Sequence, residues 1–203
     1  PLDNPAVKET VRHDVALEVA RAVPGGTIAL VGARLVTMRG DEVIEDGVVV
    51  IKGERIAAAG ARSRVSVPAG AKVIDAAGLT IIPGLIDVHA HLHYAALDIN
   101  PRSDWRYYAN LAYGVTTSHD PSAPTQLVFA QGEMVEAGLM DGPRIFSTGF
   151  ILYGAEDEDK AVIESLEEAR AHVKRLKAQG AIGVKSYNQP RRDPRQWIME
   201  AAR

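Results

Sequence analysis

The sequence contains no cysteine. This absence excludes disulfides and thiolate metal sites, so a metal ion would have to be held by histidine, by a carboxylate or by a modified lysine. Long hydrophobic runs are also absent, because no apolar stretch approaches the roughly 20 residues that a helix needs to cross a bilayer. We therefore expect no membrane partner. Composition leaves the cellular compartment open.

An excess of charge of one sign is also missing. The net charge is −3, from 23 basic and 26 acidic residues, and no basic stripe stands out, so we expect no nucleic-acid partner. A P-loop and a G-x-G-x-x-G turn are absent too, which argues against a nucleotide-binding α/β module. What is present is ordinary for a globular protein, with 46% hydrophobic and 24% charged residues. The 203 residues suffice for one large or two small domains.

The first part of the chain divides into a helix or linker (1–26) and a small β-sandwich part (27–83). Val7, Val11, Val15 and Val19 predict an amphipathic helix that ends before Pro24-Gly25-Gly26. Short β runs with turns between them then predict an antiparallel sheet with a structural role, including a hairpin turn at Gly53-Glu54. The expected strands are Thr27–Val31, Leu35–Met38, Val48–Lys52, Arg55–Ala59, Lys72–Asp75 and Leu79–Ile82.

Strand–helix alternation begins after Pro83-Gly84 and continues to the last residue (84–203). A closed (β/α)8 barrel takes about 250 residues, so we predict an α/β fold, the first half of a TIM-type barrel with its strands 1–4. Gly149–Glu164 is expected to be a loop. The strands are expected at Leu85–His91, Val115–Ser118, Arg144–Thr148 and Ile182–Tyr187. The helices are expected over Thr125–Ala137 and after N-caps at Ser103, Ser165 and Asp193.

Alternate positions at the end of the first barrel strand carry histidine: His89, His91 and His93. The side-chain period of a strand is two, so His89 and His91 are expected on one face. Two imidazoles at the carboxyl end of a barrel strand, where active sites lie, suit a pair of metal ligands. The alternative is two ordinary histidines, one buried with a partner and one solvated.

Lys185 lies in the middle of the fourth expected strand, on a face that is normally buried. Burial favours the neutral amine, which can react with carbon dioxide to form a carbamate, an anionic ligand able to bridge two metals. The separation from His89 is 96 positions (185 − 89), or three β/α units of 32 residues. The alternative is a lysine that extends from an edge strand into solvent.

Several motifs resemble the metal-dependent amidohydrolase superfamily. P-G-L-I-D-V-H-A-H-L matches its entry to the barrel, V-I-D-A-A-G-L-T-I-I-P-G its preceding sheet, and G-V-K-S-Y the place of its carboxylated lysine. The branch most similar includes imidazolonepropionase and Xaa-Pro dipeptidases and is often fused behind a Tol-type β-propeller. The resemblance implies two divalent metals, zinc being expected, held by His89, His91 and a carbamate on Lys185.

The family's remaining ligands follow later strands than those present here. Two further histidines come from strands five and six, and the general-base Asp from strand eight. The chain starts without Met and stops at Arg203 within a predicted helix, so we expect a piece of a longer protein that is inactive in isolation. The resemblance to propeller-fused proteins leans toward an exported or periplasmic location.

Other polar residues are candidates for supporting roles. Tyr187 and His119 are the candidates for catalysis, Tyr187 because it follows Lys185 by two positions and would stabilise an oxyanion. The remaining candidates would orient a ligand or meet a substrate carboxylate; they are Asp87, Asp120, Arg191 and Arg192.

Two functions follow as alternatives. One is a metal-dependent hydrolase of amide or peptide-like C–N bonds, or of a lactam or ester, with a small-molecule or peptide-like substrate. The other is a non-catalytic fragment or interaction subunit. Half a barrel exposes strand edges, so in that case we expect a homo-oligomer or a complementing chain that carries the other barrel half.

Overall fold

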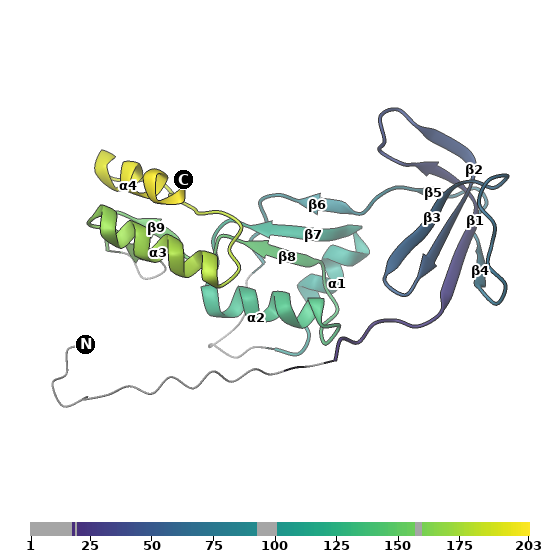
Figure 1. Cartoon of the computed structure of the whole chain (residues 1–203), viewed down its shortest axis with the longest axis horizontal. Coiled ribbons are helices and arrows are strands. Elements are labelled where there is room, and N and C mark those ends of the chain that lie inside the picture. Colours follow the sequence, from purple (N-terminus) through teal and green to yellow (C-terminus); the bar gives the residue numbers. More distant parts are fainter. Residues whose placement is uncertain (1–17, 19, 93–100, 157–159) are drawn as a thin grey trace.

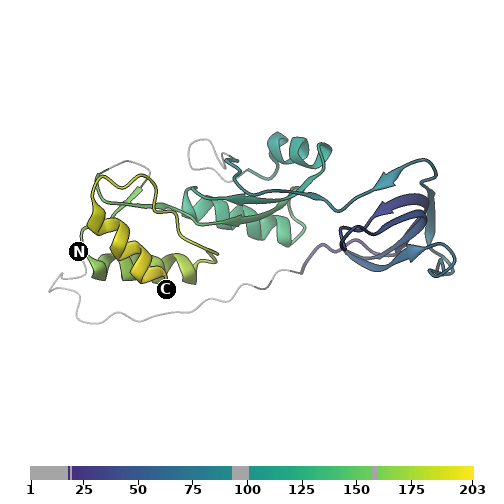
Figure 2. The ribbon, with the colours of Figure 1, turned by 90° about the horizontal axis from the view of Figure 1, so that it is seen from above.

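A computed structural model describes residues 18, 20–92, 101–156 and 160–203 of the chain. The expected N-terminal helix lies largely outside these residues, and residues 20–26 form neither helix nor strand. His93 and residues 157–159 also lie outside the described part. Figures 1 and 2 show a small sheet at one end of the molecule, a second sheet with two helices in the middle, and two further helices at the other end.

The small sheet has five strands in the order β3-β2-β1-β4, with β5 also paired to β1. The hairpin expected at Gly53-Glu54 is confirmed, because Lys52 pairs with Arg55 and Gly53 adopts the left-handed φ of 59° that such a tight turn favours. The expectation of a purely antiparallel sheet is wrong, because β4 and β5 pair with β1 in parallel. The strands are β1 (Thr27–Val36), β2 (Val43–Lys52), β3 (Arg55–Ala61), β4 (Lys72–Asp75) and β5 (Thr80–Ile81).

Both faces of this sheet are packed. Consecutive residues Val48, Val49 and Val50 of β2 are all buried, and since neighbours on a strand point to opposite faces, apolar clusters lie on both sides. Burial on two faces explains why the strand consists of continuous β-branched residues rather than an alternating pattern. The described part of this sheet presents no group of metal-binding side chains.

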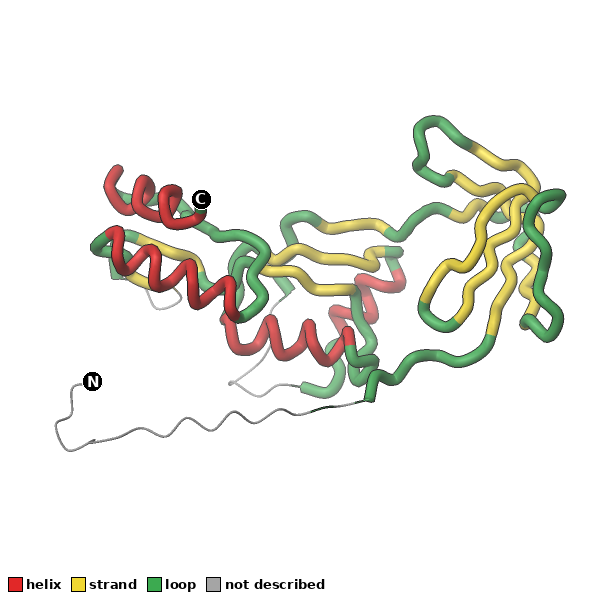
Figure 3. The backbone as a smooth tube through the Cα atoms, in the orientation of Figure 1, coloured by secondary structure: helices red, strands yellow, loops and turns green. Residues whose placement is uncertain are grey.

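The second sheet is parallel, in the order β6-β7-β8. Helix α1 packs against β7 and helix α2 against β8, and their apolar side chains enclose a core that includes Tyr107, Val128 and Met140. The mixed α/β fold class is therefore confirmed. The elements are β6 (Leu85–Asp87), α1 (Trp105–Ala112), β7 (Val115–Asp120), α2 (Thr125–Glu136) and β8 (Arg144–Ser147), as Figure 3 shows.

The last part of the chain departs most from expectation. Ile182–Tyr187, expected as strand four, forms no strand; it makes separate backbone hydrogen bonds, from Ile182 N to Ser147 O (3.2 Å) and from Leu152 N to Lys185 O (2.9 Å). Tyr187 has a left-handed φ of 47°, which interrupts extended backbone. The expected loop contains a short parallel pair, β9 (Ile151–Tyr153) and β10 (Lys160–Val162).

The starts of the helices show which of the expected N-cap residues are right. Ser165 is confirmed as the N-cap of α3 (Leu166–Ala178), where its hydroxyl accepts the Glu168 N–H at 3.1 Å. Ser103 is wrong by one position, because the Asp104 carboxylate caps α1 by accepting the Arg106 N–H at 2.9 Å. Asp193 is wrong as well: it lies within the first turn of α4 (Arg192–Ala202). Among the described helices, none is both long and apolar enough to cross a membrane.

Candidate metal centre

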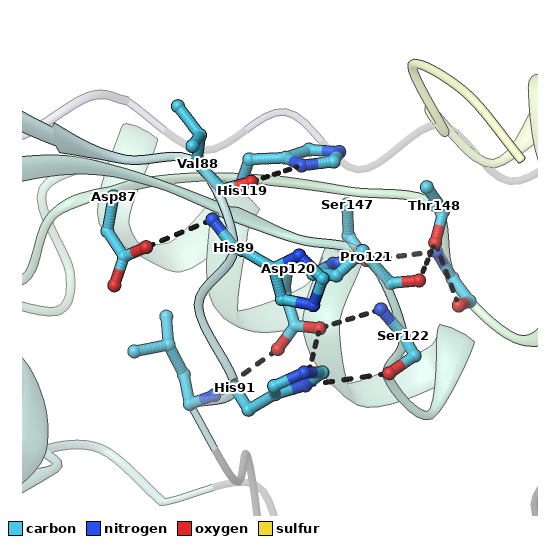
Figure 4. A network of polar contacts seen from close by, with 12 residues as sticks. Asp87, Val88, His89, His91, His119, Asp120, Pro121, Ser122, Ser147 and Thr148 are labelled. Carbon is cyan, nitrogen blue, oxygen red and sulfur yellow. Dashed lines mark hydrogen bonds and ion pairs between the residues drawn. The ribbon is translucent and has the colours of Figure 1, made fainter. Parts of the chain in front are cut away.

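The two histidines lie just beyond the end of β6. The strand ends at Asp87, whose Oδ1 accepts the His89 N–H at 3.0 Å and forms a turn there. The expectation that the strand continues to His91 is therefore wrong. The two imidazoles nevertheless lie side by side, with ring centroids 5.2 Å apart and ring planes at 68° (Figure 4).

The residues between and after the histidines explain why both rings project outward. Ala90 and Leu92 are 3% and 6% exposed, and both belong to the core beneath the sheet. Their N–H groups bind the end of β7, Ala90 N to His119 O at 2.9 Å and Leu92 N to Asp120 Oδ2 at 3.2 Å. Alternate residues are thus anchored inward, which leaves His89 and His91 exposed at the carboxyl end of β6.

Asp120 is the buried charged group of this site, with 1% of its surface exposed. Besides Leu92 N, its carboxylate accepts the Ser122 N–H at 2.8 Å. The Asp120 Oδ1 that accepts this N–H lies 3.7 Å from Nδ1 of His91, and the Ser122 hydroxyl lies 3.5 Å from the same nitrogen. Figure 4 shows the Asp120 carboxylate and the Ser122 hydroxyl meeting one edge of the His91 ring.

His119 is the penultimate residue of β7, which extends to Asp120 rather than ending at Ser118 as expected. Its Nδ1 lies 3.2 Å from the Val88 carbonyl oxygen. A carbonyl only accepts hydrogen bonds, so this contact is a hydrogen bond only when Nδ1 carries a proton. Through it the ring fastens the residue before His89 to β7.

The core under the site holds a neutral phenol. Tyr107 is fully buried and its hydroxyl donates to Gln131 of α2. Burial, and then the negative charges of Asp104 and Asp120, raise the pKa of Tyr107 well above its ordinary value. The phenol therefore acts as a fixed donor that joins α1 to α2 below the site.

Lys185 and Tyr187 lie in a separate cluster. The Lys185 Nζ is 5.8 Å from the centroid of the Tyr187 ring, which in turn lies 6.1 Å from the Tyr153 ring. Lys160 lies over both rings, at 5.1 Å from Tyr153 and 5.4 Å from Tyr187. In the part of the chain that the structure describes, no hydrogen bond or ion pair joins this cluster to the histidine pair.

The structure thus unites only part of the expected site. His89, His91, His119 and Asp120 come together at the ends of β6 and β7, whereas the described residues include no group of three His, Asp or Glu side chains arranged to hold a metal. Arg191 donates to the Gly154 carbonyl oxygen at 3.2 Å rather than facing this site.

Ser122 was missed by sequence reasoning, although a signal for it exists. It follows Asp120 by two positions, in Asp-Pro-Ser, and a carboxylate that accepts the N–H two residues later is a common turn. Ser118, on the same strand as Asp120, is fully buried, and no hydrogen-bond partner for its hydroxyl is found among the described residues.

Curated proteins similar to this chain are named dihydroorotase or imidazolonepropionase. No family model matches. The chain is 30% identical over 138 residues to a dihydroorotase from Pelobacter propionicus, covering 64% of this chain and 29% of the relative. It is 31% identical over 145 residues to an imidazolonepropionase from Streptomyces avermitilis, covering 68% of this chain and 33% of the relative. The chain thus spans about a third of the length of these relatives.

Solved structures share the fold. A Xaa-Pro dipeptidase with bound methionine aligns with a TM-score of 0.64 at 19% identity, over 87% of this chain and 54% of that one. A prolidase complexed with N-methylphosphonate-L-proline aligns with a TM-score of 0.61 at 26% identity, over 78% of this chain and 46% of that one. These likenesses support the resemblance to the amidohydrolase superfamily that the motifs indicate.

Proposed function

We propose that this chain carries the first metal ligands of a hydrolase that cleaves amide or peptide-like C–N bonds, or a related lactam or ester. The observation that supports the proposal best is the pair of exposed imidazoles, 5.2 Å apart, at the carboxyl end of a parallel strand. The relatives named dihydroorotase and imidazolonepropionase, and the prolidase and Xaa-Pro dipeptidase structures, support the same class of bond.

The donor set fits divalent metal ions, with zinc as the expected ion and two ions per complete site. His89 and His91 would each offer a neutral ring nitrogen, a ligand that zinc favours. A bound ion of this kind supplies a water of pKa near 7 and polarises a carbonyl group.

Lys185 would take part as a carbamate: its neutral amine attacks carbon dioxide, a C–N bond forms, and a proton is released. For this, Lys185 must turn from Tyr187 toward the histidines.

Two further side chains have proposed roles in handling charge and protons. In the neutral tautomer that donates Nδ1–H to Val88 O, His119 would have a free Nε2 lone pair, and we assign it as a proton acceptor near the histidine pair. Tyr187 is half-exposed and would donate its phenolic hydrogen to a developing oxyanion. The general-base Asp that the family resemblance implies follows strand eight, beyond the four barrel units expected here.

Metal binding by the chain tests the proposal. We expect zinc to bind with modest affinity in titration calorimetry, because two histidines are only part of a ligand set, and we expect His89→Ala and His91→Ala to abolish that binding. His172→Ala is the matched control, since His172 lies on α3 outside the site. Zinc affinity that is the same in His89→Ala as in the unaltered chain would contradict the proposal.

The carbamate has its own test in the enzyme that contains this chain. Lys185→Ala should lower both the metal content and the turnover, and Lys185→Ala supplied with a short carboxylic acid should recover part of both. If Lys185→Ala changes neither quantity, the assignment of Lys185 is wrong while that of the histidines still stands.

A second candidate function is an interaction subunit, and the exposed edge of β6 favours it. Leu85, Ile86 and Val88 are 50%, 63% and 71% exposed, and in the described residues β6 pairs with β7 alone. An apolar strand edge of this kind pairs readily with another chain. The proposed partner is a second copy or a chain that carries the other barrel half. A stable, well-folded monomer in size-exclusion chromatography with light scattering would count against it.

We also propose a division of the chain into two structural parts and an exported location. The separate apolar clusters of the two sheets support a sandwich part over 27–83 and a barrel part over 84–203. Export rests on the resemblance to propeller-fused proteins, and fractionation of the native host would test it.

A further inference from the structure

The end of β7 holds His91 from both sides along the backbone. The residue before it, Ala90, donates its N–H to His119 O at 2.9 Å, and the residue after it, Leu92, donates to Asp120 Oδ2 at 3.2 Å. His91 therefore has little freedom to move relative to β7. What remains undetermined by the backbone is the orientation of its ring and which ring nitrogen carries the proton.

The Asp120 carboxylate favours one orientation of the His91 ring and one position of its proton. It is 1% exposed, and its Oδ1 lies 3.7 Å from His91 Nδ1. At this distance the interaction is electrostatic, and it favours the form in which Nδ1 presents an N–H rather than a lone pair to the negative oxygen. The Ser122 hydroxyl lies 3.5 Å from the same nitrogen and can accept as well, because its oxygen has two lone pairs. The Ser122 backbone N–H, bound to Asp120 Oδ1 at 2.8 Å, holds this residue in place.

We propose that Asp120 is a positioning residue for His91, which keeps the proton on Nδ1 and leaves the Nε2 lone pair for a metal ion. Ligand histidines in proteins commonly donate their second N–H to a carboxylate, which fixes the tautomer and the ring. The metal-binding part of this inference rests on the proposed function, whereas the tautomer is a property of the chain without metal. The two parts can therefore fail separately.

The test is nitrogen NMR of the full chain, labelled with 15N in its imidazole rings, without metal and at a pH of about 8, above the ordinary histidine pKa of about 6.5. We expect His91 to show a protonated Nδ1 and an unprotonated Nε2, the reverse of the form that free imidazole side chains favour in water. His91→Gln assigns the signals. His119, whose Nδ1 faces a carbonyl, provides an internal standard for the same tautomer.

Asp120→Asn then tests whether the Asp120 carboxylate causes this tautomer of His91. We expect the His91 tautomer to shift toward protonated Nε2 and the zinc affinity to fall about 10- to 100-fold, the usual range for loss of such a partner. Asp75→Asn is the matched control. Asp75 also ends a strand and its Oδ1 accepts a backbone N–H, from Ala77 at 3.0 Å, but it lies on β4 in the other sheet.

Three results would overturn the inference. The first is an unprotonated Nδ1 on His91 in the unaltered chain, a measurement that holds even if Asp120→Asn does not fold. The second is an Asp120→Asn chain with unchanged tautomer and unchanged zinc affinity. The third is a tautomer shift in Ser122→Ala but not in Asp120→Asn, which would assign the role to the hydroxyl. If the tautomer is as expected but no zinc binds, the positioning stands and the proposed metal function fails.

Discussion

Replacing Arg21 by alanine should weaken the attachment of the small sheet to helix α2. The guanidinium of Arg21 donates through Nε to Glu136 O at 3.0 Å, at the end of α2, and pairs through Nη1 and Nη2 with the Glu54 carboxylate at 3.3 and 2.9 Å. Glu54 lies in the hairpin turn between β2 and β3. The last turn of α2 has no basic residue of its own, so Arg21 supplies the positive charge that a helix C-terminus favours.

The expected cost can be worked out from these contacts. The side chains of Arg21 and Glu54 are 47% and 35% exposed, so water screens the ion pair, which contributes about 0.2–1 kcal/mol. The hydrogen bond from a charged donor to a terminal helix carbonyl adds about 0.5–1 kcal/mol. Arg21→Ala should therefore lower the free energy of unfolding by about 0.7–2 kcal/mol, and the melting temperature by about 1–8 °C for a chain of this length.

A double-mutant cycle with Glu54→Ala separates the two contributions. In urea denaturation, the coupling between the two residues should equal the ion-pair contribution and should fall in high salt, whereas the remaining effect of Arg21→Ala should persist. Arg39→Ala is the control, because Arg39 is 82% exposed and pairs within its own turn, with Glu42. An effect of Arg21→Ala no larger than that of Arg39→Ala would refute the reasoning.

Three other substitutions have defined outcomes. Ser165→Ala should destabilise α3 by about 1 kcal/mol through loss of its N-cap, measured by urea denaturation; no change would contradict the cap. Gly84→Ala should cost about 1–3 kcal/mol, because the new Cβ would lie 2.0 Å from Thr116 Oγ1; an unchanged melting temperature would disprove the clash. Burial, and then the charge of Arg175, lower the pKa of His172, so its contribution to stability is present above the unfolded pKa of about 6.5 and is lost as the pH falls toward the lower folded value. His172→Gln should reduce this acid sensitivity, and an identical pH–stability curve would refute it.

Local chemistry made part of the fold predictable. Ser165 and the hairpin at Gly53 were found because a cap or a tight turn depends on a few neighbouring residues. The parallel pairing of β4 with β1 was not found, because that pairing joins residues more than 40 positions apart and leaves no local pattern. The β9–β10 pair was missed for a related reason: each strand has three residues, too few to show a period.

The candidate site was predictable in its residues rather than in its geometry. The alternation of His89 and His91 identified both residues, yet they are neighbours because of an Asp87 turn and the anchoring of Ala90 and Leu92, not because of strand period. The side chain of Lys185 was placed by assuming a regular strand four. That strand is absent: Lys185 O accepts the Leu152 N–H at 2.9 Å, but the Leu152 carbonyl oxygen accepts from the Gln189 side chain, at 2.7 Å.

Among the described residues β6 pairs with β7 alone, and this one-sided support bears on the stability of the histidine arrangement. Amides held by a single neighbouring strand exchange with solvent through local opening, which requires less free energy than unfolding of the whole domain. The amides of Ala90 and Leu92 report this opening directly, because both are held by the end of β7. Their deuterium exchange would therefore measure the free energy of the local opening that disrupts the arrangement of His89 and His91, the pair proposed as metal ligands.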